Sequence, residues 1–156
     1  MTPSDQDKRF MRQALVEAEK ASEKGEVPVG AVLVCQDETV FSAHNLKECF
    51  KDPTAHAEML VLREAAEKLG RWRLGGTLYA TLEPCAMCAG ALVQARIDRL
   101  VFGALDPKGG GCGSVLDVVR EPRTHHQLEV LGGVLSEEAE KILKDFFKRL
   151  RGQKGS

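Results

Sequence analysis

The sequence lacks the features of several protein classes. No hydrophobic run approaches the roughly 20 residues of a membrane-spanning helix, so no membrane partner is expected. Neither charge predominates, because 22 basic and 23 acidic side chains leave a formal net charge of −1, which excludes a globally basic nucleic-acid-binding protein. Aromatic residues make up only 5%, and the single tryptophan and tyrosine, Trp72 and Tyr79, are expected to pack rather than to stack on bases.

Disulfide bonds are not expected either. The five cysteines are odd in number, and the polar start of the chain does not resemble a secretory signal. We therefore expect a cytoplasmic protein whose cysteines bind metal or pack in the core. Cys35 ends an apolar run and is expected in the core, whereas Cys49 and Cys112 are expected as free loop thiols without a catalytic role.

The length and composition fit one globular domain spanning residues 1–156, with 43% hydrophobic and 29% charged residues. Helical and strand patterns alternate, which predicts an α/β sandwich with helices on both faces of one sheet. Ser4 and Thr54 are predicted N-caps, and Pro84 is predicted at the first position of its helix. Helices are predicted at residues 5–24, 55–69, 84–95 and 115–119 and from about 136 onward, and strands at residues 27–34, 39–44, 77–82, 100–103 and 128–131.

Three potential zinc ligands lie at the starts of two predicted helices. Cys85 and Cys88 are three residues apart on one first turn, so both sulfur atoms lie on one face, where the positive end of the helix favours thiolates. His56 lies in the first turn of another helix. Catalytic zinc sites use three protein ligands and leave a fourth position for water, so this set predicts one zinc ion per chain.

Glu58 follows His56 by two residues and therefore does not share its helix face. It is a poor second ligand, but it is suited to take a proton from water and return it to a leaving group, which predicts zinc-assisted hydrolysis. Two alternatives stay open: a redox pair of cysteines, and a structural zinc site with a fourth ligand. The candidates for that ligand are Cys35, Cys49, Cys112, His44, His125 and His126.

Positive charge gathers at the end of the chain. Residues 141–156 carry a net charge of +5, so the other 140 residues sum to −6. A basic segment on an acidic body can contact a phosphate backbone. On charge alone, the simpler interpretation is a solvated helix end, where lysine and arginine suit the negative end of the helix dipole.

The combination of His56-Ala57-Glu58 with Pro84-Cys85-Ala86-Met87-Cys88 is typical of zinc deaminases. Further matching segments are residues 25–31, 44–45, 52–59, 81–89, 102–104, 106–108, 113–114 and 145–149. Over essentially its whole length the chain resembles the bacterial tRNA-specific adenosine deaminases (TadA), in the cytidine and deoxycytidylate deaminase superfamily. It departs from their pattern at His125-His126, at Gln127 and in the glycine-rich stretch 109–112, which bears on RNA contacts and not on the chemistry.

The resemblance implies a cytidine-deaminase-like three-layer α/β/α sandwich with a five-stranded mixed sheet. It implies an RNA-editing hydrolase that acts on an amidine C–N bond and converts adenosine to inosine at the wobble position of a tRNA anticodon. It also implies a homodimer with tRNA across both subunits. The implied zinc ligands are His56, Cys85 and Cys88, the proton shuttle is Glu58, and the nucleoside contacts are Asn45, Val29 and Ala57. The implied RNA contacts are Asp106, Lys108, Phe146, Phe147, Lys148 and Arg149.

Two other functions compete with this interpretation. A deaminase of a free nucleobase or nucleoside, of the guanine or cytosine type, would share the four residues of the centre, but it would not need the basic terminal helix. A zinc-stabilised RNA-binding module would need that helix, but it would have no use for Glu58. One of Phe146 and Phe147 is expected on the apolar helix face, and the other is expected to stack on RNA bases.

Overall fold

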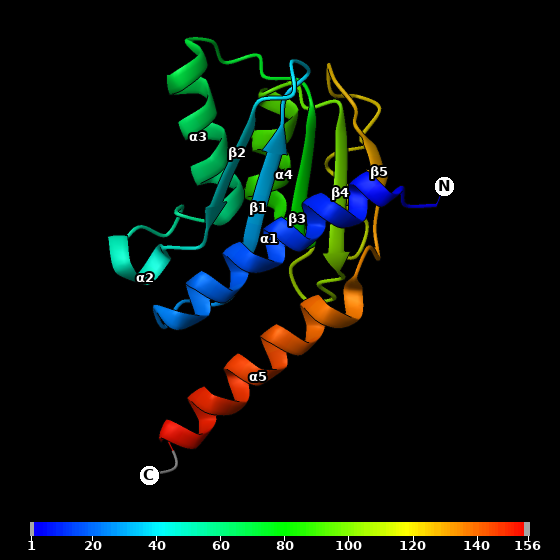
Figure 1. Ribbon diagram of the computed structural model, residues 1–156. Helices are drawn as coiled ribbons and strands as arrows, with labels where there is room; N and C mark the ends of the chain where they lie inside the picture. Colours follow the sequence, from blue (N-terminus) through cyan, green and yellow to red (C-terminus); the bar gives the residue numbers. More distant parts are fainter. Residues whose placement is uncertain (1, 155–156) are drawn as a thin grey trace.

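The computed structural model describes residues 2–154, so the ends of the predicted domain, Met1 and residues 155–156, lie outside the described part. Five strands form one mixed sheet in the order β2-β1-β3-β4-β5 (Figure 1). β1 is antiparallel to both β2 and β3, whereas β3, β4 and β5 are parallel. The strands are β1 (Gly30–Val34), β2 (Val40–His44), β3 (Thr77–Leu82), β4 (Arg99–Ala104) and β5 (Glu129–Leu131).

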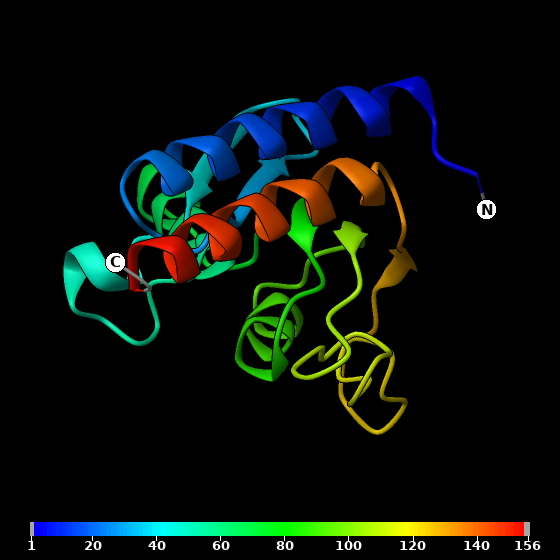
Figure 2. The same ribbon diagram turned by 90° about the horizontal axis from the view of Figure 1, so that it is seen from below.

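Helices cover both faces of this sheet, which confirms the predicted three-layer sandwich. α1 and α5 lie on one face, and α3 and α4 lie on the other (Figures 1 and 2). A short helix, α2, follows β2. The helices are α1 (Asp5–Glu23), α2 (Lys47–Phe50), α3 (Ala57–Leu69), α4 (Ala86–Gln94) and α5 (Ser136–Lys154).

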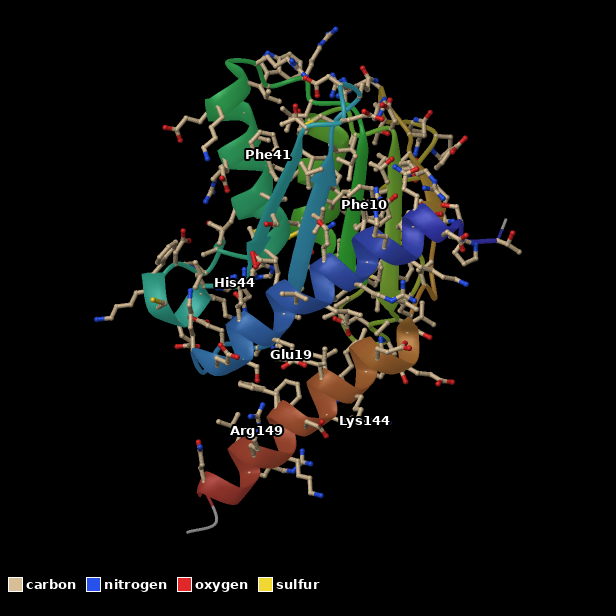
Figure 3. The ribbon with its side chains drawn as sticks, in the orientation of Figure 1. Phe10, Glu19, Phe41, His44, Lys144 and Arg149 are labelled. Carbon is tan, nitrogen blue, oxygen red and sulfur yellow. The ribbon has the colours of Figure 1, made fainter. Side chains whose placement is uncertain are left out.

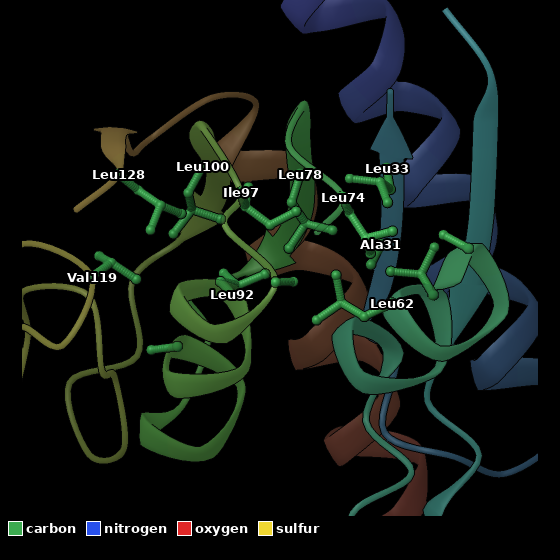
Figure 4. Packing of buried hydrophobic residues seen from close by; sticks show 14 of the residues in the cluster. Ala31, Leu33, Leu62, Leu74, Leu78, Leu92, Ile97, Leu100, Val119 and Leu128 are labelled. Atoms are coloured by element: carbon green, nitrogen blue, oxygen red, sulfur yellow. The ribbon is translucent and has the colours of Figure 1, made fainter. Parts of the chain in front are cut away.

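The strands separate two hydrophobic clusters because alternate side chains point to opposite faces. On β1, Leu33 belongs to the same cluster as Leu62 of α3 and Leu92 of α4, and Figure 4 shows these side chains in the layer between the sheet and the two helices. Its neighbour Val32 packs on the opposite face with Met11 of α1. Helices therefore cover both faces of the sheet, and the ends of the strands remain available for a binding site.

α1 is fixed by polar contacts as well as by packing. Ser4 caps it as predicted. The Ser4 hydroxyl oxygen accepts from the Asp7 amide, and the Asp7 carboxylate accepts from the Ser4 amide, which together form a capping box. The Asp7 carboxylate also accepts hydrogen bonds from the Tyr79 hydroxyl at 2.8 Å and from the Arg99 guanidinium at 2.7 and 2.9 Å. The contacts to Arg99 hold the pKa of Asp7 well below its usual value of 3.8.

Several predicted boundaries are wrong. Residues 115–119 form no helix, because the amides of Val115 and Leu116 bond to Gly110 within a looped segment. Thr54 caps no helix, since its amide and hydroxyl bond to Asp52. Pro84 precedes the cap of α4 rather than opening the helix.

Other elements differ from the prediction in extent. β1 begins at Gly30 rather than at residue 27, and α2 was not predicted. Cys49 lies in α2, where it is exposed, while Cys35 is in the core as expected. Within residues 2–154, no helix is long and apolar enough to span a membrane.

Candidate active site

The predicted site residues converge at one edge of the sheet. The parallel strands β3 and β4 both end there, and antiparallel β1 begins there. The segments that leave or enter these strands therefore meet, as in other α/β sheets that bind ligands at strand ends. Between them lies a pocket of about 160 Å³. It is lined by the predicted residues Val29, Asn45, His56, Ala57, Glu58, Cys85 and Asp106, and by Val27, Lys47, Leu82 and Glu83, which were not predicted.

The three predicted ligands are close enough to share one metal ion. Nδ1 of His56 lies 3.7 Å from Sγ of Cys85 and 3.6 Å from Sγ of Cys88. All three donor atoms lie within 4.8 Å of one another. His56 occupies the N-cap position of α3, and Cys85 occupies that of α4, so neither is within the first turn as predicted. Two helix N-termini point at this centre, and their positive ends stabilise negative donors.

The electrostatics of the ligand set favour a thiolate. Hydrogen bonds from Cys88 and His56 lower the pKa of Cys85 to about 3. The same contact with Cys85 raises the pKa of His56. The contact with Cys85 and burial raise the pKa of Cys88, so this thiol becomes a thiolate when a cation replaces its proton.

One nitrogen and two sulfur donors fit zinc, which binds histidine and cysteine in this combination. Among residues 2–154, no fourth cysteine or histidine joins the group. None of the six cysteines and histidines proposed above as a fourth ligand therefore lies with the group, so the described residues do not provide the fourth protein ligand of a structural zinc site. Three protein donors leave a position open, as catalytic zinc sites do.

Glu58 is buried beside these ligands, with 3% of its surface exposed. Its Oε1 atom is enclosed and has no hydrogen-bond partner in the described structure. Burial raises the pKa of its carboxyl group. A buried carboxyl oxygen without a partner is costly, and here it faces a pocket that a water molecule and a substrate can enter. This placement suits a group that takes up and releases protons.

Asn45 lies in the wall of the pocket, and its amide is held in one orientation. Its Nδ2 donates to the Val27 carbonyl at 3.1 Å, and its Oδ1 accepts from the Lys47 amide at 3.1 Å. An amide nitrogen has a second hydrogen and an amide oxygen a second lone pair. Asn45 therefore has one donor and one acceptor position left for a ligand.

The predicted RNA contacts fall into two groups. Asp106 lines the pocket, and exposed Lys108 follows it in the same loop. The others are on α5 and do not line the pocket.

On α5, Phe146 is buried, whereas Phe147 is 39% exposed, so Phe147 is the phenylalanine with ring surface available for stacking. Lys148 and Arg149 are exposed. Figure 3 places Arg149 on the side of α5 toward α1, where its Nη2 lies 2.6 Å from the Ser22 hydroxyl.

The sequence analysis did not single out two buried acids: Glu83, which lines the pocket, and Glu26, which accepts hydrogen bonds from the amides of α2. Burial acts to raise the pKa of Glu83, but hydrogen bonds from Ser114, Asp106 and Cys112 outweigh it and lower that pKa. The partners of Glu83 are 23 to 31 residues away, so no local pattern reveals them. The sequence did contain one signal for Glu83: it is an acid that directly precedes Pro84-Cys85 at the end of an apolar strand. His125, His126 and Cys112 are outside the pocket lining.

A buried carboxyl beside a His–Cys–Cys centre, at the edge of an α/β/α sandwich, defines the class of zinc-binding deaminases. Comparison with known proteins agrees: residues 4–104 match the family described as the cytidine and deoxycytidylate deaminase zinc-binding region. The chain is 55% identical to a tRNA-specific adenosine deaminase of Bacillus subtilis (strain 168) over 150 residues, which cover 96% of this chain and 93% of that protein. The chain belongs to the family of tRNA-specific adenosine deaminases.

Solved structures show the same relationship. One, from a study of A-to-I editing by tRNA:A34 deaminases at the wobble position, superposes with a TM-score of 0.82 at 49% identity. The match covers 86% of this chain and 99% of that one. A guanine deaminase of Bacillus subtilis is more distant, with a TM-score of 0.59, 26% identity and 92% of each chain covered.

Proposed function

We propose that this protein hydrolyses adenosine to inosine at the wobble position of a tRNA anticodon. The observation that carries the proposal is the buried Glu58 carboxyl, whose Oε1 has no partner, beside the three ligands His56, Cys85 and Cys88, in a pocket that Asn45 lines. The relatives named tRNA-specific adenosine deaminase support the choice of substrate. The overall reaction consumes one water molecule and releases ammonia.

His56, Cys85 and Cys88 would hold the zinc ion, one per chain. Bound zinc supplies a Lewis acid that makes water a stronger acid, with a pKa near 7. Glu58 takes a proton from the attacking water and delivers it to the nitrogen that leaves as ammonia. Its burial suits this work, because burial raises the pKa of the carboxyl group and makes the carboxylate a stronger proton acceptor than an exposed one.

The remaining pocket residues hold the nucleoside. Asn45 offers one donor and one acceptor without adding charge. Val29 provides an apolar wall, and the backbone of Ala57, at the start of α3, lies against the base. The target adenosine reaches them only after it leaves the anticodon stack, as other deaminases of polynucleotides require.

The partner that we propose is the anticodon stem-loop of tRNA. Asp106 and Lys108 would contact nucleotides next to the pocket, and Phe147, Lys148 and Arg149 on α5 would contact the loop and its phosphates. Phe146 supports that surface from beneath. A deaminase of free guanine or cytosine would leave this exposed basic and aromatic surface without a role.

We also propose a cytoplasmic homodimer. The five cysteines are all free, which fits a reducing compartment. An apolar groove runs between α3 and α4 and includes Met59, Ala91 and Trp72. Trp72 is 57% exposed and would be covered by a second copy of the chain.

The test is to incubate the purified protein with anticodon stem-loops and, separately, with adenosine, cytidine and guanine. We expect inosine only in the stem-loop that has adenosine at the wobble position. Deamination of a free base or nucleoside, with none of the stem-loop, would establish the competing function.

A further inference from the structure

Two buried carboxylates beside the pocket take no part in the proposed chemistry. Glu26 is 1% exposed and Glu83 is 2% exposed. Each directs both of its oxygens to backbone N–H groups of a segment that lines the pocket. A buried carboxylate whose oxygens are all bound to amides acts as a fixed anchor, because moving the segment would leave the charge without partners.

Glu83 anchors the glycine-rich loop at both of its ends. Its Oε1 accepts from the Asp106 amide at 3.1 Å and from the Ser114 hydroxyl. Its Oε2 accepts from the amides of Cys112 and Ser114, each at 3.1 Å. A Cβ atom on Gly110 would lie 2.3 Å from this carboxylate, so the loop wraps around Glu83 with no room for a side chain.

Glu26 anchors the other segment, α2. Its Oε1 accepts from the Glu48 amide at 2.9 Å, and its Oε2 accepts from the Cys49 amide at 2.6 Å. The preceding amide, that of Lys47, donates to Asn45. Three consecutive N–H groups of this four-residue helix are therefore held by side chains from outside it, which explains why so short a helix forms without a side-chain cap of its own.

The two anchored segments flank the pocket through different residues. Lys47 of α2 lines it, and so does Asp106 of the loop. Figure 2 shows α2 and the loop 105–114 well apart, with α2 at the left and the loop to the right of α4. A nucleotide chain entering the pocket would meet one segment on each side.

We propose that Glu26 and Glu83 are positioning residues that hold Lys47 and Asp106 in place for the nucleotides flanking the target adenosine. The inference rests on the proposed function. Segments that are already ordered cost less to immobilise when RNA binds, so the anchors increase affinity. The chemical step depends on α3 and α4, which carry Glu58 and the ligands, and not on these segments.

The experiment uses Glu83→Gln and Glu26→Gln, each serving as the control for the other. Glutamine replaces one acceptor oxygen with an NH₂ group that faces backbone N–H donors. We expect Glu83→Gln to speed amide hydrogen exchange at Asp106, Cys112 and Ser114 only, and Glu26→Gln to speed it at Glu48 and Cys49 only. Zinc content should stay at one ion per chain in both variants.

Steady-state kinetics on the anticodon stem-loop separate positioning from chemistry. We expect KM to rise about tenfold in each variant, while kcat stays within about threefold of the wild type. Ser114→Ala removes one of the four hydrogen bonds to Glu83 and keeps the carboxylate, so it should raise KM by only about threefold. This milder variant preserves the test if Glu83→Gln folds poorly.

Unchanged amide exchange and unchanged KM in both glutamine variants would overturn the proposal, as would a loss of kcat at constant KM. If the wild-type protein produces no inosine in the stem-loop, the proposed function fails. The exchange measurements would then still show whether the two carboxylates fix these segments.

Discussion

Carboxylates around the pocket differ in whether their oxygens have partners. Glu58 keeps a buried oxygen without one, whereas Glu26 and Glu83 are bound by backbone amides. An unpartnered buried oxygen indicates a group that meets water or substrate, and a fully bound carboxylate indicates a structural anchor. The sequence motif revealed Glu58 because it lies two residues from the ligand His56, in a pattern typical of zinc deaminases. It could not reveal the anchors, whose partners are more than 20 residues away.

Removing both thiols should remove the metal. The Cys85→Ala, Cys88→Ala double variant retains one of three ligands, so we expect its zinc content to fall from about one ion per chain to near zero. Elemental analysis of the purified proteins measures this directly. Cys49→Ala is the matched control, since that thiol is exposed on α2 and should leave zinc unchanged. Full zinc occupancy in the double variant would place the metal elsewhere.

Asn45→Ala should lower kcat/KM on the stem-loop, because it removes the donor and acceptor that the nucleoside would use. The expected loss of transition-state stabilisation is about 1–3 kcal/mol. It also removes the acceptor for the Lys47 amide, so thermal melting must accompany the kinetics. Unchanged kinetics in a normally melting variant would show that Asn45 only ends its strand.

At the scale of elements, α1 is tied to the sheet through a buried ion pair. The side chain of Asp7 is 4% exposed, and Arg99 lies 2.7 Å away. Its depressed pKa means that Asp7 contributes stability above its usual value of 3.8, and that this stability is lost as the pH falls from there toward the lower pKa of the folded state.

Asp7→Asn should therefore reduce the free energy of unfolding by about 3 kcal/mol at pH 7, because it removes the buried carboxylate that accepts hydrogen bonds from Arg99, Tyr79 and Ser4. The difference from the wild type should shrink at pH 3. Chemical denaturation at both pH values measures it. Asp5→Asn is the control, an exposed acid in the same helical turn that should change stability by less than about 1 kcal/mol. A pH-independent effect of Asp7→Asn would contradict the role of this ion pair.

The end of α5 should contribute electrostatic affinity for RNA. Replacing Lys148, Arg149 and Arg151 with alanine should weaken stem-loop binding and flatten its salt dependence by about 0.7 per lost phosphate contact, without changing zinc content. Binding measured at several salt concentrations gives the slope. Lys144→Ala is the control, an exposed cation earlier on the helix. If the triple variant keeps the wild-type affinity and slope, the basic cluster is only a solvated helix end.

Elements with strong periodicity or caps were predicted correctly, and those that depend on distant contacts were not. α1 has a capping box and a regular apolar face, so its residues alone specify it. α2 has four residues and is held by Glu26, which lies 22 residues before its first partner, so nothing local indicates it. Residues 115–119 were predicted to form a helix, but the amides of Val115, Leu116 and Val118 bond to carbonyl groups of the glycine-rich loop instead.

For the whole molecule, the order of the five strands and of the helices α1, α3, α4 and α5, together with the five-stranded mixed sheet, follows from the sequence pattern and its resemblance to deaminases. The arrangement places four strand ends and two helix N-termini around one pocket. The ligands and Glu58 were predictable because short motifs specify them. The way in which the sheet edge surrounds the pocket depends on long-range packing that the motifs do not encode.

The most direct test of the account is single-turnover inosine formation by zinc-loaded Glu58→Gln on the anticodon stem-loop. Glutamine keeps the size and burial of the side chain but cannot move protons, so we predict normal zinc content, near-normal stem-loop binding and a rate about 10²–10⁴-fold below that of the wild type. A rate within a few-fold of the wild type, at full zinc occupancy, would contradict the assignment of Glu58 as the proton shuttle.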